Sequence, residues 1–206
     1  LPDRYDEVEE GLRIHLNPVQ KRAVGDRMLQ YVVSGLDLER AVAAERRRGF
    51  LPPGAIADSG LSDICSDVAD LYQVLEAGGL AGGGADSLEV RVDLPGGRIL
   101  TGAVPGVRSS TVTQCHYSRL GAKHRLAAWV RFLALNADRP DEGFEAVTVG
   151  RGTGRGPVSV ARLGPVAGSA AARRTWAVDR LAVLVDLYDR GMREPLPLCC
   201  RTSAAW

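Results

Sequence analysis

Cys115 and His116 stand next to each other, and a thiol beside an imidazole is a pairing that cysteine nucleophiles use. Both residues fall in a segment, Thr111 to Tyr117, that we expect to form a β-strand. Adjacent side chains on a strand point to opposite faces of the sheet, so this thiol and this imidazole cannot reach each other. The two residues therefore predict no nucleophile–base pair.

The sequence also lacks the common hydrolase signatures. It contains no G-x-S-x-G, no H-E-x-x-H and no Walker lysine. Its four cysteines form no C-x-x-C pair and no zinc-finger spacing, and they are Cys65, Cys115, Cys199 and Cys200. We therefore expect reduced thiols in a cytoplasmic protein, no metal site and no cofactor.

The densest basic cluster of the expected core covers residues 118–125 and contains Arg119, Lys123 and Arg125. It lies where a predicted strand turns into a predicted helix, so that the amides of the helix N-terminus and the cations would point the same way. Such an arrangement suits an anion or the backbone of DNA. A solvated, charge-rich helix start explains the same residues equally well, and the sequence leaves both interpretations open.

Two glycine-rich stretches need a structural explanation. Residues 78–84 hold five glycines, follow a predicted helix and precede a predicted strand, without the lysine that a phosphate-binding loop of the Walker type requires. We interpret them as a linker. Residues 150–156 join two predicted strands, which favours a flexible hairpin over an arginine contact to phosphate.

Composition excludes several classes of protein. The 206 residues carry 26 basic and 25 acidic side chains, a net charge of +1, and 45% of them are hydrophobic. These values are typical of a soluble globular domain, and no apolar run approaches the ~20 residues of a membrane-spanning helix. A net charge this close to neutral disfavours a stand-alone nucleic-acid-binding domain. A first residue other than Met leads us to expect a piece of a longer polypeptide.

The first third of the chain predicts three helices. Asn17-Pro18 is a helix start, and the helix is expected to end at Ser34. Asp37 can cap a second helix that ends at Gly49. A helical repeat of apolar residues from Ile64 to Leu75 predicts a third. We expect residues 1–84 to form a helical annex with its linker, and residues 85–206 to form the core with a C-terminal tail.

In the second region the apolar period changes to two. Strands are predicted over 88–94, 99–104, 111–117, 144–149 and 158–162. A helix apolar nearly all round, expected to be buried, covers 123–136, and a long helix around 176–188 is closed by Gly191. The order after the annex is β-β-β-α-β-β-α. We expect an α/β fold with a mixed sheet covered by helices.

A succession of short motifs resembles a known family. The motifs are Phe50-Leu51-Pro52-Pro53-Gly54 after Arg-Gly, Gly102 in the second strand, Tyr117-Ser118-Arg119-Leu120, Lys123-His124-Arg125-Leu126-Ala127-Ala128-Trp129, Leu187 to Pro197, and Thr202-Ser203-Ala204-Ala205. In this order they resemble the C-terminal region of the gamma subunit of exodeoxyribonuclease V, the RecC family, of the actinobacterial type. The similarity covers essentially the whole chain. The sequence departs from the family's pattern at Cys199-Cys200 and at Trp206.

The resemblance implies a PD-(D/E)xK (restriction-endonuclease-like) core that has lost its catalytic residues. An active relative places an Asp at the end of the second strand and (D/E)-x-K on the third, to hold Mg²⁺ and to assist the attacking water. In this sequence Pro105, Cys115 and Tyr117 stand at those positions. Glu89 and Asp93 on the first strand could in principle replace these acids, but they lie outside the (D/E)-x-K register.

Function follows from the resemblance as an expectation. The family helps to assemble RecBCD, a helicase–nuclease complex that processes DNA ends for recombinational repair. We expect a non-catalytic domain that binds the RecD motor, works with RecB and helps to channel a DNA strand, with no membrane partner. The annex and the tail residues Pro195, Leu196 and Pro197 are the expected partner interface. The alternative is an active metal-dependent DNase with a migrated catalytic acid.

Overall fold

A computed structural model of the chain describes residues 16–49, 51, 55–82, 84–152, 154 and 156–196, with the side chains of 55–59 left out. Three helices come first: α1 (Pro18–Val33), α2 (Leu38–Arg47) and α3 (Ala55–Ala77). The predicted caps are present, because the Asn17 and Asp37 side chains accept from the backbone N–H groups of Gln20 and Arg40. None of the described helices is long and apolar enough to span a membrane.

The predicted order of the core elements is confirmed. The structure has β1 (Asp86–Leu94), β2 (Arg98–Arg108), β3 (Thr111–Arg119), α4 (Ala122–Asp138), β4 (Glu145–Arg151), β5 (Val158–Leu163) and α5 (Ala170–Gly191), with a 3₁₀ turn (Pro95–Gly97) between β1 and β2. The strands form one sheet in the order β1-β2-β3-β4-β5. Only β3 and β4 are parallel, and the other neighbours are antiparallel. An α/β fold with a mixed sheet is therefore confirmed.

The second strand is longer than its sequence indicates. We expected it to end at Val104, but β2 continues through Pro105 to Arg108. A bulge carries the chain past the proline, since Ser87 pairs with Pro105 and Asp86 already pairs with Val107. Gly106 lies between them at a φ of 82°, and a Cβ there would come within 2.4 Å of the Thr113 carbonyl oxygen. This position therefore needs glycine.

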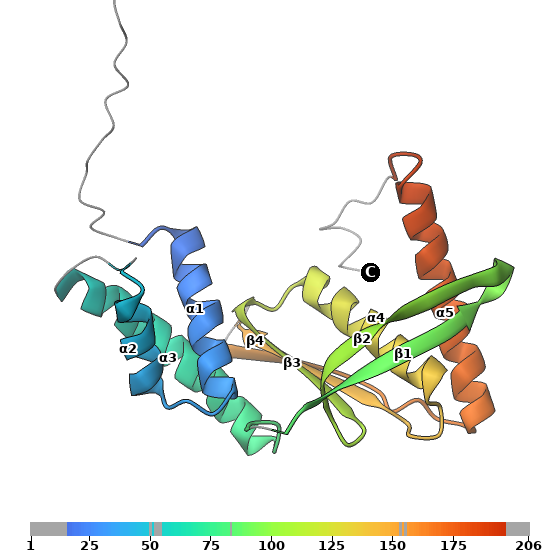
Figure 1. The fold of residues 1–206 in the computed structure, drawn as a ribbon, viewed down its shortest axis with the longest axis horizontal. Coiled ribbons are helices and arrows are strands. Elements are labelled where there is room, and N and C mark those ends of the chain that lie inside the picture. The colour runs from blue at the N-terminus through green and yellow to red at the C-terminus, as the bar shows by residue number, and fades with distance from the viewer. Residues whose placement is uncertain are drawn as a thin grey trace, which may run out of the picture.

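Two hydrophobic cores lie on opposite faces of the sheet. In one, α1, α2 and α3 pack on Tyr117 of β3 and on Val147 and Val149 of β4. In the other, α4 and α5 pack on β1, β2 and the opposite face, where Val112 and Ala146 are buried. Figure 1 shows α1–α3 at one end of the molecule and α5 at the other, with the sheet between them.

Helix α4 is less buried than its composition suggests. Its second half is enclosed, with Phe132, Leu133 and Leu135 at 1% exposure or less. Its first turns reach the surface, where Leu126 is 53% exposed, and Trp129 is only partly buried. The prediction of a helix buried on all sides is wrong for that first half, because no other described element covers Leu126.

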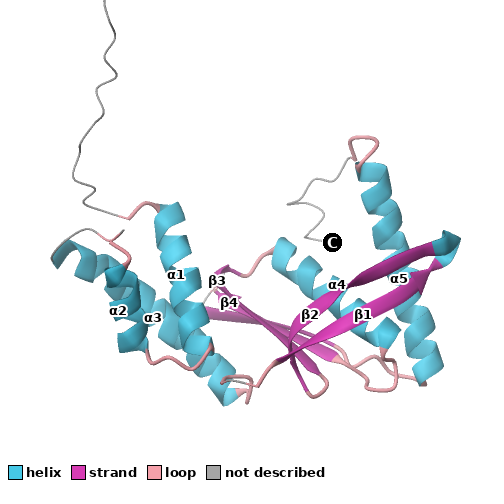
Figure 2. Cartoon of the chain, in the orientation of Figure 1, coloured by secondary structure: helices cyan, strands magenta, loops and turns pink. Residues whose placement is uncertain are grey.

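The β1–β2 hairpin leaves the rest of the sheet and leans on α5 (Figure 2). Arg98, next to the hairpin turn, donates to Asp189 at 2.8 Å and to Asp186 at 2.6 Å, both on α5. On the side of β3, β2 pairs only through Val107 and Arg108. The two strands therefore separate soon after their turn.

Candidate functional site

The turn between β3 and α4 is held by His124. Its Nδ1 accepts the Gly121 N–H at 3.1 Å, so the neutral ring carries its proton on Nε2 and donates to the Ser118 hydroxyl at 3.0 Å. The ring is 7% exposed. Burial, followed by the charges of Lys123 and Arg22, lowers the pKa of His124. This residue thus fixes the start of α4 as an uncharged imidazole.

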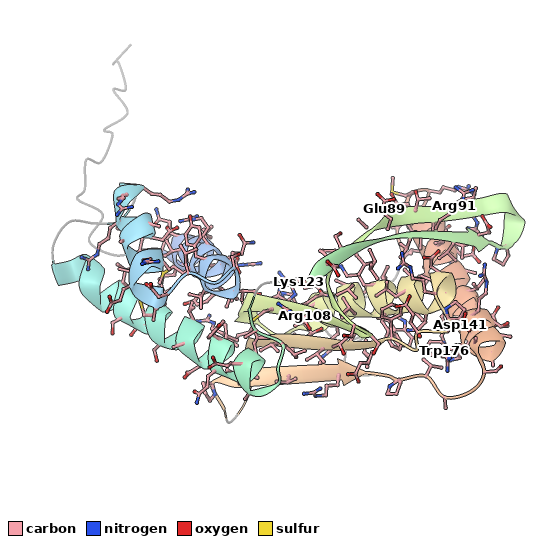
Figure 3. All side chains as sticks on the ribbon, turned by 60° about the horizontal axis from the view of Figure 1, so that its bottom comes forward. Glu89, Arg91, Arg108, Lys123, Asp141 and Trp176 are labelled. Carbon is pink, nitrogen blue, oxygen red and sulfur yellow. The ribbon has the colours of Figure 1, made fainter. Side chains whose placement is uncertain are left out.

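The three predicted DNA-contacting residues are all exposed, but they do not share one face. Lys123 lies on the side of α1, where its charge lowers the pKa of His116 after burial and the charges of His124 and Arg131. Figure 3 shows Lys123 on the part of the core that faces the N-terminal helices. Arg125 instead lines a cavity of about 310 Å³ with Thr148 and Arg162 on the side of β5. Arg119 ends β3 beside Arg151.

Two further cations lie near this turn, and the sequence patterns did not indicate them. Arg131 lies eight residues after Lys123, and that helical spacing could have placed both on one side of α4. Arg22 comes from α1, and no local pattern connects it with residues a hundred positions away. Both act on the histidines of the turn. The basic surface around this turn therefore includes Arg22 and Arg131 in addition to the basic residues of 118–125.

Cys115 and Tyr117 point to the same face of β3 and pack in the core beneath α1 and α3. Burial raises the pKa of the Cys115 thiol to about 12, so the thiol is protonated at neutral pH. The Tyr117 ring lies against Gly25 of α1, where an added Cβ would come within 2.3 Å of it. Helix α1 therefore covers the Tyr117 ring, whereas Cys115 is only partly buried and also lines a groove of about 500 Å³ between β3 and α1.

The Tyr117 hydroxyl donates to the Asp67 carboxylate of α3 at 2.8 Å. Arg151 of β4 binds the same carboxylate, and its guanidinium lies 4.5 Å from the centre of the Tyr117 ring. Burial and the Asp67 contact raise the pKa of Tyr117. Arg151, one of the two arginines in the stretch 150–156, is thus bound to other residues of the protein.

The two acids that could replace the missing catalytic carboxylates do not lie beside the third strand. Glu89 and Asp93 are exposed on β1, the outermost strand, and β2 separates them from β3 (Figure 3). Pro105 is exposed within β2. Across the described ranges, no three His, Cys, Asp or Glu side chains are grouped so as to hold a metal ion. Glu89 and Asp93 therefore place no carboxylate beside β3.

Comparison with known proteins identifies the family. The model of the RecC C-terminal domain matches residues 1–206. The chain belongs to this family. It is 37% identical over 209 residues to the RecBCD enzyme subunit RecC of Mycolicibacterium smegmatis, and 35% identical over 208 residues to that of Mycobacterium tuberculosis. Each alignment covers 100% of the chain and 18% of the relative, so the chain spans less than a fifth of these proteins.

In this RecC C-terminal domain the predicted tail interface is described only in part. Pro195 is exposed. Leu196 is half-buried and lies near Gly191 at the end of α5, where an added Cβ would come within 3.3 Å of it. Pro197 lies outside the described residues. The role of this segment as a partner interface stays a prediction.

Proposed function

We propose that this domain is a non-catalytic structural and DNA-handling part of a RecBCD helicase–nuclease, acting in the cytoplasm on DNA ends. In this proposal it assembles with the RecD motor, in a complex that also contains RecB, and helps to guide a DNA strand. Family membership supports the complex, since the matched relatives are named as RecC subunits of the RecBCD enzyme.

One observation carries the non-catalytic part of the proposal: on the face of β3 that would hold the acid and the lysine, Cys115 and Tyr117 pack against the N-terminal helices and supply neither a carboxylate nor an amine. We propose that residues 85–206 are a degenerate PD-(D/E)xK core, with Pro105, Cys115 and Tyr117 in place of its catalytic residues, and that residues 1–84 are an annex to it. Mg²⁺ prefers anionic oxygens. A protonated thiol and a protonated phenol beneath α1 and α3 do not supply them.

The DNA-handling part rests on the basic turn. Arg119, Lys123 and Arg125 are exposed around the N-terminus of α4, where the helix dipole also favours anions. Because Lys123 and Arg125 lie on different sides of the helix, we propose a contact with the backbone of a strand that passes over the turn. No pocket for a base is needed.

A cleavage assay separates this proposal from the alternative DNase. The chain is incubated with end-labelled forked DNA and Mg²⁺ or Mn²⁺, and we expect no product above the level with a chelator. Metal-dependent cleavage that Glu89→Gln or Asp93→Asn abolishes would instead establish a migrated acid and reject the non-catalytic role.

A further inference from the structure

The groove of about 500 Å³ between α1 and β3 has polar side chains on both sides. Arg22 and Gln30 of α1 line one side, and His116 and Ser118 of β3 line the other. The His116 ring lies 4.5 Å from the ring of His124, which fixes the start of α4. The groove therefore borders the basic turn on the side of the N-terminal helices.

Three cations from two helices surround this pair of rings. Arg22 belongs to α1, whereas Lys123 and Arg131 belong to α4. The charges of Lys123 and Arg131 act on His116, and those of Lys123 and Arg22 act on His124. Residues that are about a hundred positions apart in the sequence thus bring their positive charges to one place at the groove.

This positive charge is only partly compensated. Asp26 is the one acidic residue among those that line the groove, and it pairs with Arg22 at 3.5 Å. Burial lowers the pKa of both histidines, so neither ring adds a charge at neutral pH. Three cations, Arg22, Lys123 and Arg131, stand against one carboxylate, and the groove keeps a surplus of positive charge.

Arg131 is the arginine that lacks a partner. Its side chain is half-buried, and in the part of the chain that the structure describes it makes no hydrogen bond and no ion pair. A guanidinium that is partly withdrawn from water loses hydration, and a bound anion compensates that loss. All other half-buried arginines of the described ranges have such a bond, and they are Arg27, Arg98, Arg108, Arg139, Arg151 and Arg173.

The spacing of the two α4 cations suits a chain of phosphates better than a single one. Guanidinium groups bind phosphate oxygens through paired hydrogen bonds, and lysine adds a point charge. Lys123 and Arg131 lie about 12 Å apart along α4, at a rise of roughly 1.5 Å per residue, which is further than one phosphate group reaches. Lys123 also belongs to the basic turn, so a strand that crosses the turn meets this groove next.

We propose that a DNA strand continues from the basic turn along the groove between α1 and β3, where Lys123, Arg131 and Arg22 bind its phosphates. The inference deepens the proposed function and rests on its DNA-handling part. It adds Arg22 and Arg131 to the contacts, and it directs the strand toward the N-terminal helices and not toward the cavity beside β5 that Arg125 lines.

Removing the two added cations tests this path. The double variant Arg22→Gln and Arg131→Gln is made in the full RecC subunit and assembled with its partner subunits. Fluorescence anisotropy with forked DNA over a salt series should show an affinity about tenfold lower and a slope of log K against log salt reduced by about 1.5, since each neutralised phosphate contributes roughly 0.7–0.9.

The matched control for this double variant is Arg47→Gln with Arg174→Gln. Both arginines are exposed, on α2 and α5, and neither lines the groove. The control removes the same charge and should change neither the affinity nor the slope. Equal behaviour of the two double variants would reject the groove.

A gain of binding provides the second test, because a folding defect cannot imitate it. Asp26→Asn removes the one carboxylate that lines the groove and frees Arg22, so we expect forked DNA to bind about threefold more tightly. Asp63→Asn is the matched control, because it frees Lys21 of α1 from an ion pair of 3.6 Å outside the groove. No gain from Asp26→Asn, or the same gain from both, would overturn the proposed path.

Free phosphate is the other source of the same chemistry. Isothermal titration of the full RecC subunit with inorganic phosphate should give no saturable binding, because one phosphate cannot reach both α4 cations. Saturable binding that the Arg22→Gln and Arg131→Gln variant abolishes would assign the groove to free phosphate and overturn the strand path.

The inference and the proposed function fail in different ways. If the Arg22 and Arg131 variant equals its control while loss of Arg119, Lys123 and Arg125 weakens DNA binding, only the path along the groove is rejected. If neither variant weakens DNA binding, the DNA-handling part of the proposed function is rejected as well.

Discussion

The Tyr117 side chain ties three elements together. Its hydroxyl bonds Asp67 of α3, its ring lies against Gly25 of α1, and Arg151 of β4 stacks on it. In the proposed degenerate nuclease core this position belongs to a catalytic lysine. Under that proposal, a residue that would serve chemistry is replaced by one that fastens the helical layer to the sheet.

Removing the hydroxyl should measure this fastening. Tyr117→Phe leaves the Asp67–Arg151 ion pair in place but deletes a hydrogen bond to a carboxylate, a contribution of about 1.5–3 kcal/mol to the free energy of unfolding. Tyr188→Phe, at a side chain 66% exposed, is the control and should change it by less than about 0.5 kcal/mol. Urea denaturation of the chain gives both values, and equal losses would show that the hydroxyl does not fasten the layer.

The two neighbouring histidines predict loss of stability in acid. Burial and nearby cations lower the pKa of His116 and His124, although Asp26 acts in the opposite direction on both. The unfolded chain therefore takes up protons first as the pH falls below about 6.5, and the folded state loses stability from that point downward. Proton NMR should find both rings titrating below about 6.5 in the folded chain. A ring that titrates above that value would contradict the environment described for it.

At the scale of elements, the contact between α1 and β3 is close because Gly25 has no side chain. A Cβ would come within 2.3 Å of the Tyr117 ring, so Gly25→Ala should force the helix away from the strand. We expect a loss of about 1–3 kcal/mol, the range for overpacking, although alanine favours a helix by about 1 kcal/mol.

Gly60→Ala on α3 is the matched control for that substitution. An added Cβ there meets nothing within 4 Å, so the change should stabilise the chain by about 0.5–1 kcal/mol. Thermal or urea unfolding of both variants gives opposite signs if the contact is as described. Stabilisation by both would contradict it.

Elements with a clear period could be predicted, and their order is confirmed. Local patterns predicted the caps at Asn17 and Asp37 and the strand over 88–94. Each of these features depends on residues that are close in sequence, so tertiary packing does not change it. The extension of β2 past Pro105 could not be predicted, since a proline usually ends a strand and the bulge depends on its pairing with β1. The exposure of Leu126 could not be predicted either, because it depends on which other elements pack against the first turns of α4.

The candidate sites also differ in whether local sequence could indicate them. The basic turn could be found because Arg119, Lys123 and Arg125 are close in sequence. The Asp67–Tyr117–Arg151 contact joins residues 34 to 84 positions apart, and the groove beside Cys115 joins α1 to β3. Such contacts follow from tertiary packing, which no local pattern in the sequence encodes.

At the scale of the whole molecule, the basic turn should contribute to DNA binding by the assembled complex. Replacing Arg119, Lys123 and Arg125 with Ala should weaken binding to forked DNA. It should also reduce the slope of log K against log salt by about 2, because each phosphate that a cation neutralises contributes roughly 0.7–0.9 to that slope. Fluorescence anisotropy over a salt series measures both quantities.

Exposed arginines elsewhere provide the control for that variant. Replacing Arg47, Arg174 and Arg193 with Ala removes the same number of charges from α2, α5 and the residues after α5. We expect the salt slope to stay unchanged. An equal fall in both triple variants would mean that overall charge, and not the turn, attracts the DNA.

The central claim is that this domain serves assembly and not cleavage, and co-elution tests it most directly. The purified chain is run on a sizing column with the RecD motor subunit, with and without forked DNA. We predict a stable complex with the motor in the absence of DNA. No binding to the motor, together with tight binding of forked DNA by the chain alone, would contradict the assembly role.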